Sequence, residues 1–544
     1  MERKFLYGAS FFARIVFMRS MLTIFAAAIA AGASLADEVK IPRNESEDTG
    51  AIMSKKYWSD WNDEVQARID RDIEANRKAD AVLKIGGIAK GTKVKVAQIS
   101  HDFIFGAHIF NFDQLGDKTL NAKYRSLYGT FFNSATVPFY WSKFEMQPDR
   151  PRFASEYWDS QEYWENSADP KNEMHWRRPP TDKIVDYLKE NGVRVHGHAL
   201  VWGSRAWAFP AWLFDKCLEG EEKEKFKSII RSPMVDGIKA KNEIYNSKYA
   251  KMSPQELSEQ FPKLAANLKR EFADRIVRIA GYYGDKIESW DVVNESLADY
   301  ALGDMNVGGK LMKSDRYKIM PADYTFDGFQ AAQKAFPKNV KLNINDAPYR
   351  YIEHYKPQIQ ELVSRGCKID IVGWQMHIFN PRTIGDVAAG VDGKDKLNMD
   401  KLKPSKIWKD YALVDCGIPI HMSEITITAP EDTERGRMVQ AIITRNMYRI
   451  WFSLKSVMGV TWWNVVDDCG AKGEPSISGL FTRTMEPKPA FYALNQLLNS
   501  EWKTRLELVP DADGNIKFRG FRGKYRISWT DSDGNEKFMN YYLK

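Results

Sequence analysis

Eight short apolar segments, each separated from the next by a stretch with helical periodicity, constrain the fold of this 544-residue chain more than any other feature. The helical pattern is clearest in residues 182–191, 271–283 and 435–452. Strands that alternate with helices in this way build parallel βαβ units. The segments predicted as strands are residues 104–110, 134–139, 193–202, 287–295, 340–347, 369–377, 418–428 and 459–467.

Eight parallel strands are the number that closes a (β/α)₈ barrel, and we expect this fold for residues 101–499. An open, doubly wound sheet is the alternative. It is disfavoured because no glycine-rich phosphate-binding sequence follows any of the predicted strands. Two long connections, residues 150–180 and 215–268, follow the second and third strands. Both should therefore lie on the carboxyl-terminal face, where barrels carry their active sites.

The segments that flank the barrel carry different signals. Residues 57–84 are highly charged with a helical pattern, and a short alternating stretch follows them. Near the other end, two Asp-Gly-Asn turns that begin at Asp513 and Asp533 separate alternating segments, which is typical of antiparallel strands. We expect residues 37–100 and 500–544 to pack together as a small β-rich unit, either as a clamp on the barrel or as an accessory sugar-binding module.

Residues 1–36 have the features of a signal peptide. Basic residues precede an alanine-rich apolar stretch that is too short to span a membrane, and Ser34 and Ala36 are the small residues expected before a cleavage site. The basic leader is long, so Met18 or Met21 is an alternative start. No cysteine follows the site, which disfavours a lipoprotein anchor. The sequence predicts a secreted or periplasmic protein with no stable membrane partner.

Charge and cysteine content exclude further classes of function. The net charge is +7, and acidic and basic residues are interleaved, so nucleic-acid binding is not expected. Four cysteines are too few for a disulfide scaffold, although Cys367 and Cys416 each precede a predicted strand and are a candidate pair. A metal-dependent hydrolase would need histidine clusters, and only His196 and His198 alternate on one strand. We expect no cofactor and a monomer.

Two carboxylates stand out among the polar residues at the ends of the predicted strands. Glu295 ends the fourth strand and Glu424 lies in the seventh, so the two should face each other across the barrel mouth. A single carboxylate at a strand end is usually a solvated or salt-bridged residue. Two that flank an aromatic-lined cleft suit the cleavage of a glycosidic bond, because one can donate a proton while the other attacks the anomeric carbon.

The chain resembles glycoside hydrolase family 10, the xylanase family, whose fold is a (β/α)₈ barrel. The matching segments occur in the family's order over about 105–495, and Trp-Asp-Val-Val-Asn-Glu at 290–295 is the most specific of them. These segments are Gly197–Trp202, Trp290–Glu295, Asn345-Asp346, Gln375–His377, Ser423–Ile427, Gly459–Trp463 and Lys488–Phe491.

The resemblance implies that Glu295 is the general acid/base and Glu424 the nucleophile of a retaining double displacement. It further implies that Asn294 binds the 2-hydroxyl of the sugar being cleaved and that His377 orients Glu424. The full set of substrate-binding residues that it implies is Asn294, His198, Trp202, Gln375, His377, Trp463, Asn345 and Asp346. Plain buried roles for the two histidines and for Trp463 remain alternatives.

The departures from the family pattern concern the neighbouring sugar. Residues 136–145 replace a Pro-Glu-Asn-Glu-Met-Lys-Trp segment whose polar side chains grip the next xylose, and here aromatic residues take their place. Thr426 replaces an aspartate, so we expect His377 to lose a usual partner. Arg205 replaces a glutamine, and because a guanidinium binds carboxylates in a bidentate manner, it suggests an anionic or decorated sugar.

Three hypotheses follow for the function. The first is a secreted, retaining, endo-β-1,4-xylanase-like hydrolase that cleaves internal bonds of a xylan-type polysaccharide. The second keeps this chemistry but changes the substrate to a different or decorated β-linked glycan. The third is a non-catalytic carbohydrate-binding barrel, which is disfavoured because a site that only binds gains nothing from keeping both an acid and a nucleophile.

Overall fold

The computed structural model of the chain describes residues 39–544, apart from 89–90, 154–160, 173–179, 203–208, 211, 228–251, 304, 306–310, 313–319 and 472. The predicted signal peptide, residues 1–36, and Arg205 therefore lie outside the described residues. Within the described ranges, no helix has both the length and the apolar character needed to cross a membrane.

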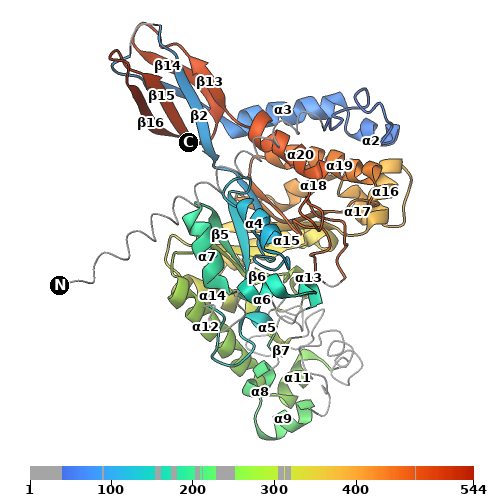
Figure 1. Cartoon of the computed structure of the whole chain (residues 1–544). Helices are drawn as coiled ribbons and strands as arrows, with labels where there is room; N and C mark the ends of the chain where they lie inside the picture. Colours follow the sequence, from blue (N-terminus) through green and yellow to red (C-terminus); the bar gives the residue numbers. More distant parts are fainter. Residues whose placement is uncertain are drawn as a thin grey trace, which may run out of the picture.

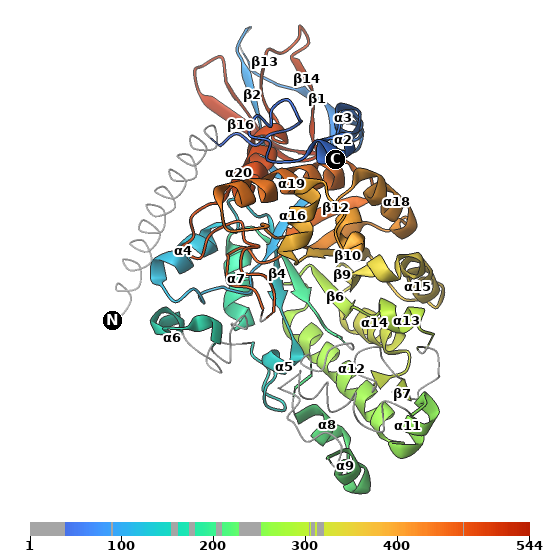
Figure 2. The same cartoon turned by 90° about the vertical axis from the view of Figure 1, so that its right-hand side faces the viewer.

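Eight parallel strands close a barrel at the centre of the molecule (Figures 1 and 2). In order around the barrel, they are β3 (Ile104–His108), β4 (Ser134–Pro138), β5 (Arg194–His198), β6 (Ser289–Asn294), β9 (Lys341–Asp346), β10 (Ile371–Ile378), β11 (Ile420–Ile427) and β12 (Val457–Trp462). All eight fall within or across the segments predicted as strands, so the predicted (β/α)₈ barrel is confirmed. Nearly every residue of these strands is buried, because the barrel covers each strand on both faces, and polar residues such as His196 and Asn343 are buried beside the apolar ones.

The helices between the strands pack on the outside of the barrel (Figure 2). The principal ones are α4 (Lys118–Ser126), α7 (Thr181–Glu190), α12 (Leu264–Tyr283), α14 (Tyr324–Ala335), α15 (Ile352–Ser364), α18 (Pro404–Val414), α19 (Glu434–Ser453) and α20 (Pro489–Gln496). In α12, the residues at helical spacing Leu268, Phe272, Ile276 and Ile279 are buried, as an amphipathic helix on a sheet requires. Helix α19 is buried on nearly every side because α20 and a helix of the N-terminal extension pack against it.

Shorter elements occupy the connections. They are α5 (Trp141–Phe144), α6 (Gln161–Asn166), α8 (Trp212–Cys217), α9 (Gly220–Lys227), α11 (Pro254–Gln260), α13 (Leu297–Ala301), β7 (Leu311–Met312), β8 (Met320–Pro321), α16 (Pro381–Ala389) and α17 (Lys396–Asp400). Helices α8, α9 and α11 belong to the long connection after β5 and project from the end of the barrel opposite the terminal sheet (Figure 1).

Both ends of the chain build a small β-rich unit beside the barrel, as the sequence predicts (Figure 1). Strands β13 (Arg505–Leu508), β2 (Val94–His101), β15 (Gly523–Thr530) and β16 (Glu536–Leu543) form one sheet, and β1 (Lys78–Lys84) pairs with β14 (Asn515–Phe521). A separate apolar cluster that includes Val96, Phe518 and Ile527 stabilises the unit.

The expectation of a helix over residues 57–84 is correct only in part. Helices α2 (Lys55–Asp60) and α3 (Asp63–Arg77) occupy most of this segment, but its last seven residues are strand β1. The backbone of β1 pairs antiparallel with β14, so a partner from the far end of the chain overrides the local helical pattern. At the end of α3, the Arg77 side chain donates to the carbonyl of Val457 at 2.7 Å, which ties this extension to the barrel.

The candidate pair Cys367 and Cys416 does not form a disulfide, and all four cysteines are free thiols. Cys367 lies between α15 and β10, where its Sγ faces the side-chain amide of Gln330 on α14. Cys416 lies between α18 and β11.

Candidate active site

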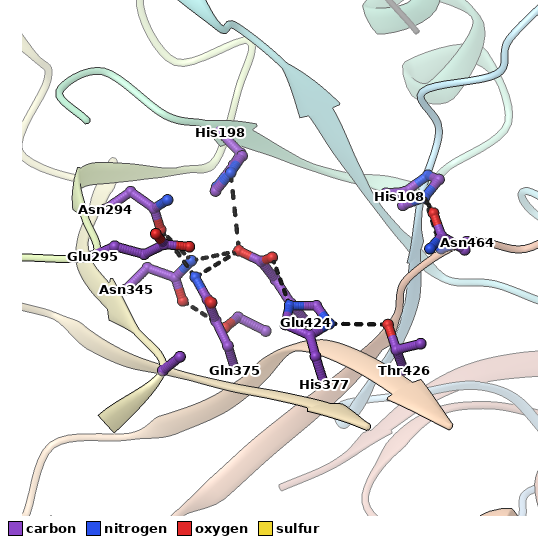
Figure 3. Close-up of polar contacts among 12 residues, drawn as sticks. His108, His198, Asn294, Glu295, Asn345, Gln375, His377, Glu424, Thr426 and Asn464 are labelled. Atoms are coloured by element: carbon purple, nitrogen blue, oxygen red, sulfur yellow. Dashed lines mark hydrogen bonds and ion pairs between the residues drawn. The ribbon is translucent and has the colours of Figure 1, made fainter. Parts of the chain in front are cut away.

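Glu424 in β11 lies at the centre of a hydrogen-bonded network at the carboxyl ends of the barrel strands (Figure 3). Its Oε1 accepts from Nδ2 of Asn345 at 2.8 Å and from Nε2 of Gln375 at 2.9 Å. Its Oε2 lies 3.2 Å from Nε2 of His377. With three partners and only 5% of its surface exposed, the carboxylate is fixed in a single orientation.

The order of the strands explains why these side chains meet. Asn345 comes from β9, Gln375 from β10 and Glu424 from β11, which are consecutive in the barrel. Gly373 lies beside Asn345 in the register, and a Cβ atom there would lie 2.2 Å from Asn345 Oδ1. Glycine is therefore required for Asn345 to reach Glu424. Ser423 secures the same amide, because its hydroxyl donates to Asn345 Oδ1 at 2.5 Å.

Asn294 connects this network to the opposite wall. Its Oδ1 accepts from Asn345 Nδ2 at 2.9 Å and from Gln375 Nε2 at 3.1 Å. Because both donors occupy the carbonyl oxygen, the amide is fixed with its NH₂ group turned away from them. The side chain is almost fully buried at the end of β6. Because its oxygen is already occupied, Asn294 can offer a donor, but not an acceptor, to a ligand in the cleft.

Glu295 follows Asn294 directly, and its backbone leaves the strand with a φ of +54°. A left-handed conformation at a non-glycine residue costs of order 1–3 kcal/mol and persists only where surrounding contacts impose it. Here the Glu295 amide donates to the carbonyl of Asn345 at 2.8 Å, and the indole of Trp202 donates to the Glu295 carboxylate at 3.3 Å. The carboxylates of Glu295 and Glu424 point into the same space from two walls of the barrel (Figure 3).

His198 lies between the buried carboxylate of Asp291 and the carboxylate of Glu424. Its Nδ1 lies 2.8 Å from Oδ2 of Asp291, and its Nε2 lies 3.9 Å from Oε1 of Glu424. Burial lowers the pKa of His198. The hydrogen bond to Asp291 and the charges of Glu424 and Glu295 raise it by more, so the net pKa lies above its ordinary value. Burial opposes ionisation of Asp291, yet His196 and His198 hold the pKa of its carboxyl well below its usual range.

His377 has a partner that the sequence analysis did not anticipate. Its Nδ1 lies 2.9 Å from the hydroxyl of Thr426, which is fully buried (Figure 3). The expectation that His377 loses its partner when threonine replaces the family's aspartate is therefore wrong. A hydroxyl in the same place takes over the contact.

Both carboxyl oxygens of Asp346, which the resemblance implies as a substrate-binding residue, accept hydrogen bonds from the backbone. Its Oδ2 accepts from the backbone amide of Leu297 at 2.8 Å, and its Oδ1 accepts from the amide of Ala347. Burial raises the pKa of Asp346 to about 8, with a further contribution from Glu295, while the backbone donors oppose the shift. The carboxyl thus braces the turn that carries Glu295, at the beginning of α13.

The two tryptophans singled out from the sequence both lie close to His198, near the carboxylate pair. Trp202 contacts Glu295 as described. The ring of Trp463, which follows β12, meets His198 edge-on at 5.7 Å and His377 at 6.1 Å between ring centroids. Trp463 has 3% of its surface exposed, and Trp202 is partly buried and packs against the same aromatic cluster.

Phe110 and Tyr140 join Trp463 in a compact aromatic cluster. Phe110 was missed by the sequence analysis, and Tyr140 was noted only as part of the aromatic segment 136–145. Each lies two residues beyond the end of a barrel strand, β3 or β4. This position could have marked both residues as mouth-lining, but the same pattern is equally typical of core residues.

In the part of the chain that the structure describes, the histidines of β5 are not arranged as metal ligands. Across the described ranges, no group of three or more His, Cys, Asp or Glu side chains is arranged to hold a metal ion. His196 and His198, which alternate on β5, both contact Asp291 instead. Arg205 lies outside the described residues.

Comparisons with known proteins identify relatives of this chain. A family model described as glycosyl hydrolase family 10 matches residues 158–497. Endo-1,4-beta-xylanase A of Thermoanaerobacterium saccharolyticum is 24% identical over 321 residues, which cover 58% of this chain and 22% of that protein. Endo-1,4-beta-xylanase A of Halalkalibacterium halodurans is 28% identical over 317 residues, covering 56% and 67%.

The chain spans less than half the length of several of these relatives, such as 42% of endo-1,4-beta-xylanase A from a Caldicellulosiruptor species. Among solved structures, native xylanase 10B from Thermotoga maritima matches with a TM-score of 0.45 and 19% identity, over 74% of this chain and 96% of that one. Because the family model covers more than half of the sequence, this protein belongs to glycosyl hydrolase family 10.

Proposed function

We propose that the protein is a retaining glycoside hydrolase that cleaves β-1,4-xylosidic bonds of a xylan-type polysaccharide. The observation that carries this proposal is the pair of carboxylates, because Glu424 is fixed by three hydrogen-bonding partners while Glu295 points into the same space. Membership of the family supports the chemistry. The relatives that are named endo-1,4-beta-xylanases support the substrate.

In the first step, Glu424 attacks the anomeric carbon while Glu295 donates its proton to the glycosidic oxygen. The bond between the anomeric carbon and this oxygen breaks, the leaving chain departs with the proton, and a glycosyl ester forms on Glu424. In the second step, Glu295 accepts a proton from water, which attacks the anomeric carbon and breaks the ester. Glu424 is released as a carboxylate and Glu295 is again protonated, with net retention at the anomeric carbon.

The neighbouring side chains would favour the transition state. The amide NH₂ of Asn294 is directed to the cleft and would donate to the 2-hydroxyl of the reacting sugar, an interaction that strengthens as positive charge develops on the ring. His198, whose pKa is raised, would place a positive charge beside Glu424 and stabilise its carboxylate form as the ester breaks. His377 would hold the second oxygen of Glu424 for in-line attack.

Secretion is part of the proposal, because polysaccharides of this kind lie outside the cell and residues 1–36 have the pattern of a signal peptide. A second candidate substrate is an anionic or decorated β-linked glycan, which Arg205 in the sequence favours. If this is correct, Arg205→Ala lowers activity on glucuronoxylan more than on a neutral xylan. An equal change on both polymers would contradict it.

Hydrolysis by the mature protein tests the proposed function, with the variants Glu295→Gln and Glu424→Gln beside the wild type. Glu190→Gln, at the exposed end of α7 away from the barrel mouth, is the matched control. The panel includes glucuronoxylan, arabinoxylan, mixed-linkage glucan and mannan, with products identified by mass spectrometry. We expect xylose-containing products from the wild type and the control only. Binding without any product would favour the non-catalytic barrel, and products from another glycan would change the substrate.

A further inference from the structure

Three consecutive strands of the barrel are each followed closely by an aromatic residue at the mouth. Trp463 comes directly after β12, Phe110 two residues after β3, and Tyr140 two residues after β4. These strands are neighbours in the order β12–β3–β4. Their carboxyl ends therefore bring the three rings to the same part of the mouth, beside Glu424 and its partners.

The three rings pack on one another and leave little surface exposed. Phe110 meets Trp463 at 5.1 Å and 78°, and meets Tyr140 at 5.7 Å and 82°, which are favourable edge-to-face arrangements. Their exposed fractions are 0% for Phe110, 3% for Trp463 and 7% for Tyr140. Tyr140 also packs against His198 and Trp202. An aromatic platform for sugar stacking needs an open ring face, so this cluster is a wall.

The position of this aromatic wall relative to the acid/base decides what it blocks. Of the three strands, β12 stands directly across the closed barrel from β6, which leads into Glu295, while β3 and β4 lie three and two strands from β6. The general acid must lie on the side of the leaving group, because it protonates the oxygen of the bond that breaks. Trp463 and Phe110 therefore lie toward the other end of the reacting sugar, where the chain would continue through the 4-hydroxyl, and Tyr140 extends the wall from there to Trp202.

We infer that Phe110, Tyr140 and Trp463 close the cleft one sugar beyond the cleaved bond, so that the protein acts on chain ends and releases single sugars. This inference rests on the proposed function and replaces the expectation of internal cleavage. A further sugar at the wall would place its hydroxyl groups against ring carbons, and polar groups buried without partners are costly.

Two chromogenic substrates test this inference directly. The 4-nitrophenyl glycosides of β-xylose and of β-xylobiose share the leaving group and differ only by one sugar on the walled side. We expect the wild type to release 4-nitrophenol from the xyloside with a kcat/KM roughly tenfold or more above that for initial release from the xylobioside, because direct release from the xylobioside needs its second sugar on the walled side. Faster initial release of 4-nitrophenol from the xylobioside would overturn the inference and leave the proposed function standing.

Variants of Tyr140 separate the wall from general damage. Tyr140→Ala is expected to raise the xylobioside-to-xyloside ratio of kcat/KM, whereas Tyr140→Phe keeps the ring and should keep the wild-type ratio. Tyr542→Ala, at an exposed position on β16, is the matched control. An unchanged ratio in a folded Tyr140→Ala protein would contradict the role of the wall. If the wild type cleaves neither glycoside nor any xylo-oligosaccharide, the proposed function itself fails and the inference falls with it.

End-labelled oligosaccharides give an independent measurement. Xylohexaose labelled at its reducing end should yield unlabelled xylose and labelled xylopentaose as the only initial products of the wild type. Initial formation of labelled xylobiose or xylotriose would show internal cleavage and overturn the inference.

Discussion

The hydroxyl of Thr426 lies 2.9 Å from Nδ1 of His377, and Nε2 of the same ring lies 3.2 Å from Oε2 of Glu424 (Figure 3). A hydroxyl can donate as well as accept a hydrogen bond. Thr426 can therefore donate to Nδ1 while the Nε2–H group donates to Glu424, and both contacts are satisfied by a neutral imidazole. An aspartate at position 426 can only accept, so it would favour a proton on Nδ1 and a cationic ring.

Substitution of Thr426 should weaken the orientation of His377 toward Glu424. Thr426→Val removes the donor and should lower kcat by roughly fivefold, since a lost hydrogen bond of this kind costs about 1 kcal/mol. Thr426→Ser keeps the hydroxyl and is the control. Initial rates of hydrolysis give kcat for the wild type and both variants, and Tm checks that each protein is folded. An unchanged kcat in a folded Thr426→Val protein would contradict the account.

Gly373→Ala should disturb the orientation of Glu424 indirectly, by displacing Asn345. The added Cβ would lie 2.2 Å from Asn345 Oδ1, so the amide must move away from Glu424. We expect kcat to fall by about one to two orders of magnitude, as for the loss of one preorganised donor at a reacting carboxylate. Gly281→Ala on α12, where a Cβ meets nothing within 4 Å, is the matched control and should keep full activity. Full activity of a folded Gly373→Ala protein would show that Asn345 is dispensable.

Asp346→Asn tests the brace behind Glu295. The two carboxyl oxygens of Asp346 accept from the amides of Leu297 and Ala347, and in asparagine one of them becomes an NH₂ group that faces a donor. Such a mismatch of buried polar groups costs about 1–3 kcal/mol, so we expect a lower Tm together with a lower kcat. KM should change little, because both carboxyl oxygens of Asp346 are engaged by backbone amides of the chain around Glu295. Asp186→Asn, exposed on α7, is the control, and a large rise in KM with unchanged kcat would support direct substrate binding instead.

The pair formed by His198 and Asp291 predicts a pH dependence of stability. The pKa of His198 is raised in the folded protein, so its protonated form stabilises the fold fully below the unfolded pKa of about 6.5. This contribution is lost as the pH rises from that value through the folded-state pKa. Asp291→Asn removes the partner and with it the raised pKa. The difference in free energy of unfolding between wild type and variant should therefore shrink above about pH 6.5. Urea denaturation across this range measures it, and a constant difference would contradict the prediction.

The sequence predicted the parts of this molecule that local patterns determine. The eight strands are short apolar runs between turn residues, and Glu295 and Glu424 were located because strand ends in a barrel face one mouth. Residues 78–84 were predicted as helix because the choice between helix and strand depends on pairing with β14, which no local pattern reveals.

The side-chain contacts that the sequence did not predict have a similar explanation. The directions taken by Asp346 and Thr426 depend on groups contributed by other strands, namely the Leu297 amide and the His377 ring. Likewise, Phe110 becomes part of a wall only when β3 is placed between β12 and β4. Spacing along the chain specifies which residues reach the mouth, but the closed barrel decides which of them meet.

Trapping of the glycosyl-enzyme most directly tests the claim that Glu424 is the nucleophile of a retaining hydrolysis. A 2,4-dinitrophenyl 2-deoxy-2-fluoro-β-xyloside has an electron-withdrawing fluorine that slows both steps, while its good leaving group lets the ester form faster than it is hydrolysed. Intact mass and peptide mapping should show one fluoroxylosyl group on Glu424 of the wild type. Glu424→Gln should remain unlabelled, and Glu295→Gln should still be labelled because this leaving group needs no proton. A label on any other residue, or hydrolysis with inversion and no label, would contradict retaining catalysis by Glu424.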